Sequence, residues 1–121
     1  MKKLLPLFLA VLILTSCQQH PVSASLSSPS PDGKTMITIK AQKPSSLDPF
    51  TVTMEVKEGD VSQGSLQFEI GASTIDSSNV KYEWADSNNC IITFTHSDGE
   101  KRIFRYYATS TNVVLQEIKK D

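Results

Sequence analysis

The sequence predicts an all-β fold, a small antiparallel β-sandwich of about seven strands. Three observations predict it: apolar residues recur at every second position after residue 33, turn-forming residues separate these segments at short intervals, and no segment keeps an uninterrupted apolar stripe at helical spacing. Short alternating strands with frequent turns are typical of sandwiches and small barrels.

The first three expected strands are residues 36–41, 50–57 and 66–70. In 50–57, Phe, Val, Met and Val occupy one face, while Thr, Thr, Glu and Lys occupy the other, as in a half-buried strand. The segment 42–49 contains two prolines, which interrupt a strand, and 72–79 is small and polar. Both are therefore expected to be long loops.

The last four expected strands follow one another through short turns, one of them containing Asp98-Gly99, a pair favoured where φ is positive. They are expected to form a meander, and the two long loops before them suit crossings between sheets. We therefore favour an immunoglobulin-like sandwich over a small barrel. These strands are residues 80–84, 90–94, 102–108 and 113–118.

Two inward-facing side chains merit separate predictions. Trp84 is expected in the core near Phe68 and Phe94, where its indole N–H needs an acceptor; the alternative is a surface Trp that stacks on a ligand. Cys90 lies between apolar residues of a predicted strand. A buried, inert thiol is favoured there over a reactive one.

The N-terminus has the three-part plan of a secretory signal. Lys2 and Lys3 precede an apolar run over residues 4–14, which is too short to span a bilayer and is expected to be processed. The run ends in Leu14-Thr15-Ser16-Cys17, an aliphatic residue, two small residues and a cysteine. This segment resembles the lipobox of bacterial lipoproteins. The alternative is a plain secretory signal followed by a chance cysteine.

The resemblance implies that residues 1–16 are removed and that Cys17 becomes a lipidated first residue. Two or more acyl chains give stable membrane anchoring, so the implied address is the bacterial cell envelope, with the membrane as a partner through the lipid on Cys17. Gln18 follows the cysteine where an Asp would retain such a protein in the inner membrane, which favours the outer membrane.

Residues 17–32 are predicted to be the lipidated cysteine and a flexible tether. Between 18 and 31 there are five serines, three prolines and no charged residue, a composition that cannot bury enough apolar surface to offset its chain entropy. The folded domain is accordingly expected over residues 33–121.

The charged residues exclude several classes of function. The chain has 12 basic and 13 acidic side chains and no basic cluster, so a nucleic-acid partner is not expected. His96 is the one histidine of the predicted domain, which leaves a hydrolase triad and a zinc site improbable. We expect no catalytic residue, no metal and no cofactor.

One strand carries a candidate interaction surface. If Phe104 and Tyr106 face the core, Ile103, Arg105 and Tyr107 form an exposed stripe. Tyr and Arg are favoured at binding hot spots, although an ordinary strand with a polar outer face would show the same alternation.

These observations favour a lipid-anchored, non-catalytic binding or accessory module with an envelope protein as possible partner. The alternative is a small envelope enzyme or enzyme inhibitor that uses the loops 42–49 and 72–79.

Overall fold

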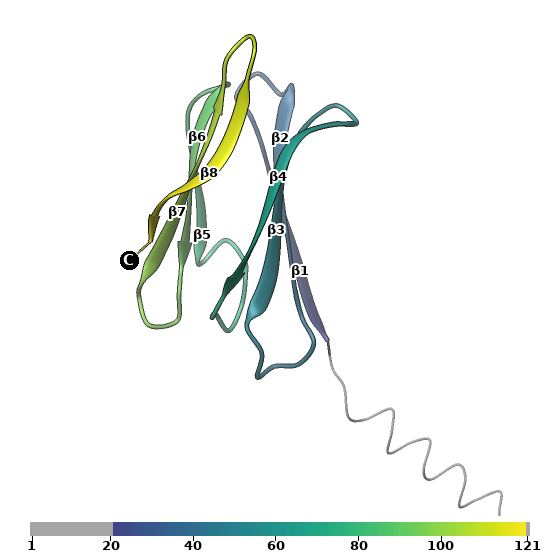
Figure 1. Cartoon of the computed structure of the whole chain (residues 1–121). Coiled ribbons are helices and arrows are strands. Elements are labelled where there is room, and N and C mark those ends of the chain that lie inside the picture. The colour runs from purple at the N-terminus through teal and green to yellow at the C-terminus, as the bar shows by residue number, and fades with distance from the viewer. Residues whose placement is uncertain (1–20, 121) are drawn as a thin grey trace, which may run out of the picture.

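The computed structural model describes residues 21–120, which form two four-stranded antiparallel sheets packed face to face (Figure 1). The predicted sandwich is confirmed, with eight strands rather than seven. No helix in the described part of the chain is long and apolar enough to cross a membrane. Sheet A contains β1 (Val22–Pro29), β2 (Thr35–Lys43), β3 (Phe50–Glu58) and β4 (Val61–Ile70), and sheet B contains β5 (Val80–Asp86), β6 (Asn89–Thr95), β7 (Lys101–Ala108) and β8 (Val113–Lys120).

Each sheet is a meander of consecutive strands, in the order β1-β2-β3-β4 and β5-β6-β7-β8. The predicted meander of the last four strands is confirmed. The loop 44–49 joins β2 to β3 within sheet A, so only the segment 71–79 crosses between the sheets. An immunoglobulin-like arrangement needs Greek-key connections, which a single crossing cannot supply, and that part of the prediction is wrong.

The eighth strand lies inside the predicted tether. Residues 22–29 form β1, which pairs with β2 from Val22 opposite Lys43 to Pro29 opposite Met36. Val22, Ala24 and Leu26 pack against the core while the serines between them face outward, so the segment buries apolar surface after all. The tether prediction is therefore wrong for these residues. Cys17 and the signal segment lie outside the described residues.

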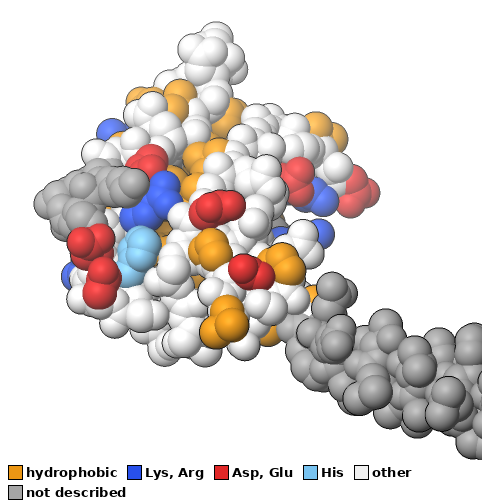
Figure 2. All heavy atoms as spheres, turned by 60° about the horizontal axis from the view of Figure 1, so that its bottom comes forward, with side chains coloured by type: hydrophobic (Ala, Val, Ile, Leu, Met, Phe, Trp, Pro, Cys, Tyr) orange, Lys and Arg blue, Asp and Glu red, His pale blue; other side chains and the backbone are white. Residues whose placement is uncertain are grey.

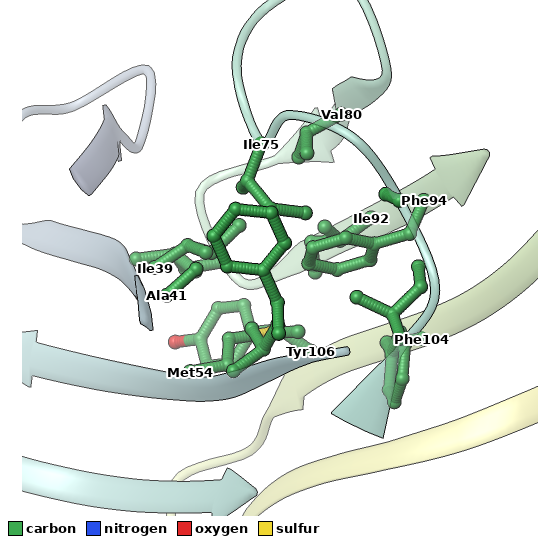
Figure 3. Close-up of a cluster of buried hydrophobic side chains, with 14 of the residues drawn as sticks. Ile39, Ala41, Met54, Ile75, Val80, Ile92, Phe94, Phe104 and Tyr106 are labelled. Atoms are coloured by element: carbon green, nitrogen blue, oxygen red, sulfur yellow. The ribbon is translucent and has the colours of Figure 1, made fainter. Parts of the chain in front are cut away.

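The core lies between the sheets and receives alternate side chains from both. Figure 3 shows Ile39, Ala41 and Met54 of sheet A beside Ile92 and Phe94 of sheet B. Burying such side chains stabilises the fold by about 1.5–3 kcal/mol each, and this is what holds the two sheets together. The sixteen buried apolar residues include the following with no more than 1% exposure: Ile37, Ile39, Ala41, Phe50, Val52, Met54, Val56, Ile70, Cys90, Ile92, Phe94 and Phe104.

Polar contacts link the sheets at both edges. Trp84 on β5 donates its indole N–H to Ser28 Oγ on β1 (2.9 Å), which supplies the predicted acceptor. Its ring packs edge-on against Tyr106. The two residues predicted near it, Phe68 and Phe94, pack on each other instead, with a centroid distance of 5.0 Å. The aromatic ring therefore closes one edge of the core instead of occupying its centre.

Arg102 links the sheets at the opposite edge. Its guanidinium lies over the ring of Phe68 (4.7 Å), forms an ion pair with Glu117 (2.7 Å) and donates to the backbone carbonyl of Glu69 on β4. The hydrogen bonds that Arg102 donates to the Glu117 carboxylate raise the pKa of Arg102 above its usual range. Because Arg102 belongs to β7 and Glu69 to β4, this side chain joins sheet B to sheet A.

Candidate interaction surface

The outer face of sheet B carries the stripe predicted from the sequence. Phe104 and Tyr106 are 1% and 3% exposed, so they face the core, which is the alternative under which the sequence gave the stripe. Their neighbours on β7 face outward: Arg105 and Tyr107 are exposed, and Ile103 is half-buried. The condition on which the stripe depended is therefore met, and Arg105 and Tyr107 are exposed while Ile103 is exposed only in part. The role of these residues in binding stays a prediction.

Strand pairing adds apolar residues to this stripe that the sequence analysis did not single out. Val114 on β8 lies opposite Tyr107, and Ile91 on β6 lies opposite Arg105. Val114 and Ile118 are exposed despite their apolar side chains. We call this set the sheet B patch, and its members are Ile91, Ile103, Arg105, Tyr107, Val114 and Ile118.

The β8 residues were missed because the strand has apolar side chains at consecutive positions. Val113 and Leu115 pack against the core, and Val114 between them must face outward. The pairing of β7 with β8 shifts at Ile103/Phe104, so that Lys119 and Glu117 oppose these two residues and Ile118 is the extra residue of the bulge. The Val113-Val114-Leu115 run was the one available sequence signal.

Arg105 is the charged residue at the middle of the patch. Its guanidinium lies 5.0 Å from the centre of the Tyr107 ring, and its Nε donates to Asn89 Oδ1 at 3.4 Å. Within residues 21–120 it forms no ion pair with a carboxylate. The arrangement orients an aromatic ring and a cation together and leaves most guanidinium N–H groups available for an acceptor on a partner.

A polar hollow of about 310 Å³ opens at the end of the sandwich where β1 turns into β2, and Asp32, Glu58 and Tyr106 contribute to its wall. Burial raises the pKa of Tyr106, and both carboxylates add to this effect. The hydroxyl of Ser30 donates to Asp32 at 2.6 Å and holds the pKa of that carboxyl below its usual range. A phenol that stays protonated beside two carboxylates can bind a polar solute.

Cys90 lies in the core and is not a reactive thiol. Cys90 is fully buried, as predicted, and burial raises the pKa of its thiol to about 11. At neutral pH it is a thiol and not a nucleophilic thiolate. Among residues 21–120, no three His, Cys, Asp or Glu side chains come together in a way that could hold a metal ion.

The two loops of the enzyme alternative lie at the same end of the molecule (Figure 1). They line separate hollows, since Pro44 contributes to one beside β1 and Ser77, Ser78 and Asn79 contribute to one on the outer face of sheet B. Asp76 accepts hydrogen bonds from the hydroxyl and the N–H of Ser78, which lower its pKa. Its carboxylate therefore stabilises the turn of its own loop.

The chain matches no protein-family model, no curated protein and no solved structure. The sheet B patch therefore has to be interpreted from its own geometry.

Proposed function

We propose that this protein is a lipid-anchored module of the bacterial cell envelope that binds a protein partner through the sheet B patch. The observation that carries the proposal is the Arg105–Tyr107 pair on β7, an oriented aromatic ring and cation among exposed aliphatic side chains. No catalytic step is assigned to the module.

The composition of the patch supports protein binding. Tyr and Arg are enriched among residues that dominate binding energy, and energetically neutral neighbours that exclude water usually surround them. Ile103, Val114 and Ile118 are suited to this second role. Because the guanidinium of Arg105 lacks a carboxylate partner within the described residues, we expect the partner to present a carboxylate or carbonyl oxygen.

The membrane address rests on the lipobox resemblance of residues 14–17. We expect Cys17→Ser to lose palmitate labelling and to leave the membrane fraction, because the thiol is the proposed lipid attachment. Fractionation of cells that express the wild type and the variant measures this. A variant that stays membrane-bound would contradict the anchor, whatever its binding properties.

The binding surface can be tested by crosslinking in cells followed by affinity purification from the envelope. We expect Tyr107→Ala to lower partner recovery about tenfold or more, the effect of removing a hot-spot residue. Thr53→Ala, an exposed position on the outer face of sheet A, is the matched control and should recover the partner as the wild type does. Equal recovery with Tyr107→Ala would count against the patch.

A further inference from the structure

Leu47, in the loop between β2 and β3, is the most exposed large hydrophobic residue of the described chain, at 95% exposure. The next, Val61, is 61% exposed. Single exposed apolar residues are normal on protein surfaces, so exposure alone assigns no role. Two further features distinguish Leu47: hydrogen bonds fix the conformation of its loop, and this loop lies beside the start of β1.

The loop 44–49 holds Leu47 outward through its own hydrogen bonds. The N–H of Leu47 donates to Ser45 Oγ (3.3 Å), and the N–H of Asp48 donates to the Ser45 carbonyl (3.2 Å). The Ser45 hydroxyl in turn donates to the Asp48 carboxylate at 3.0 Å. Pro44 and Pro49 flank the turn and restrict its backbone further. The leucine is thus presented to the outside by an ordered turn.

The loop lies at the end of the sandwich where β1 begins. Val22 is opposite Lys43 in the sheet, so the first residue of β1 and the last residue of β2 are neighbours at the base of the loop (Figure 1). Cys17 precedes Val22 by five residues, which span at most ~18 Å. A lipid on Cys17 therefore confines this end of the domain to the vicinity of the bilayer.

Charged side chains around this end are mixed in sign and are interspersed with hydrophobic ones, as Figure 2 shows from this side. Such a surface has no strong preference for anionic lipid, and Asp48 beside Leu47 would be repelled by it. The features that fit a bilayer are the apolar side chain and its distance from the anchor. We therefore consider uncharged or zwitterionic headgroups.

We propose that the loop 44–49 inserts Leu47 at the boundary between lipid headgroups and acyl chains, as a second membrane contact beside the lipid anchor. This inference rests on the proposed anchor. One leucine cannot hold a domain on a membrane by itself, but a short link to the lipid turns its insertion into an intramolecular event at high effective concentration. Two contacts fix the orientation, with the hollow beside Asp32 and Glu58 directed away from the bilayer.

The test uses the mature lipidated chain in vesicles of phosphatidylcholine and phosphatidylethanolamine. Leu47→Cys carries a polarity-sensitive fluorophore, and Ser110→Cys in the β7–β8 turn is the matched control at the opposite end. The buried Cys90 does not compete for the label. We expect a blue shift and quenching by lipid-borne quenchers at position 47, and the emission of a water-exposed label at position 110.

Vesicle flotation separates the two proposals. If the labelled protein floats but position 47 remains as accessible to iodide as position 110, the loop insertion is wrong and the anchor stands. If position 47 is shielded from iodide yet not quenched by lipid, a protein covers the loop and the insertion is likewise wrong. If the protein does not float, both the anchor and the insertion are wrong.

Discussion

The two sheets have similar inner faces and different outer faces. Inward, both contribute fully buried aliphatic and aromatic side chains to one core. Outward, sheet B presents the aliphatic residues, Tyr107 and Arg105 of the sheet B patch. The outer face of sheet A presents mostly hydroxyl and amide side chains, with the exposed Met36 as its apolar exception. The hydroxyl and amide residues are Ser23, Ser25, Ser27, Thr38, Thr51, Thr53 and Gln67.

The two outer faces differ in what their side chains gain from exposure in the isolated domain. A hydroxyl on an outer face satisfies its hydrogen bonds with water or with a neighbour, as Ser27 Oγ and Thr38 Oγ1 do at 3.3 Å. An exposed Tyr, Val or Ile gains nothing comparable in the isolated domain. Sheet A exposes two large apolar side chains, Met36 on β2 and Val61 at the start of β4, whereas sheet B groups Tyr107, Val114 and Ile118 around Arg105. It is this grouping, rather than the exposure of any one side chain, on which the proposed contact with another molecule rests.

The largest effects are expected from the inner faces, where the two sheets should behave alike. Ile39→Ala in sheet A should cost about 2–5 kcal/mol of unfolding free energy, and Phe104→Ala in sheet B about 3–5 kcal/mol, because each leaves a cavity in a close-packed core. Denaturant titration followed by circular dichroism measures both. Tyr107→Ala and Thr53→Ala should stay within about 0.5 kcal/mol of the wild type, as surface substitutions do. A loss at Tyr107 as large as at Phe104 would remove the distinction between the faces.

An intermediate effect should appear at alkaline pH, where the inner faces differ. Sheet B contributes the buried thiol of Cys90, whose pKa is raised to about 11 by burial. It also contributes the phenol of Tyr82, whose pKa burial raises above that of an exposed tyrosine. The unfolded thiol loses its proton near pH 9 and the folded thiol only at higher pH. The unfolded state therefore binds fewer protons between these values, and the free energy of unfolding falls as pH rises, by up to about 1.4 kcal/mol per pH unit for one group.

Denaturant titrations at pH 9 and pH 10 measure this dependence, with Cys90→Ala as the comparison. The variant loses some stability at every pH, but the fall from pH 9 to pH 10 should become shallower because the titrating thiol is gone. An unchanged slope would show that the thiol is not the source of the pH dependence, and would place it on the tyrosines of the same sheet.

The sequence predicted the sandwich because period-two alternation reports directly which side chains are buried. For β7 it gave only a conditional facing, because Ile103 and Phe104 are consecutive apolar residues. It failed for β1, whose Ser-rich composition is typical of a tether although Val22, Ala24 and Leu26 alternate. Composition is an average, whereas strand formation there depends on pairing with a distant β2. The order of strands also depends on such pairings, so the loop lengths alone gave the wrong connections. Val114, which lies opposite Tyr107, was missed because it stands between two other apolar residues and alternation does not show which of the three faces outward.

The smallest effects are expected from the ion pairs of the two outer faces, which offer a final comparison. Lys57 and Glu55 approach to 3.6 Å on sheet A, and Lys81 and Glu83 approach to 4.0 Å on sheet B. All four side chains are at least one-third exposed, so water and salt screen both pairs. Glu55→Gln and Glu83→Gln should each change the unfolding free energy by less than about 0.5 kcal/mol at 0.15 M salt. If Glu83→Gln nevertheless lowered partner recovery while Glu55→Gln did not, the partner's footprint would extend from the sheet B patch to the β5 edge. An equal loss with both would show instead that the recovery assay responds to net charge, and the contrast between the faces would then have to rest on Tyr107 alone.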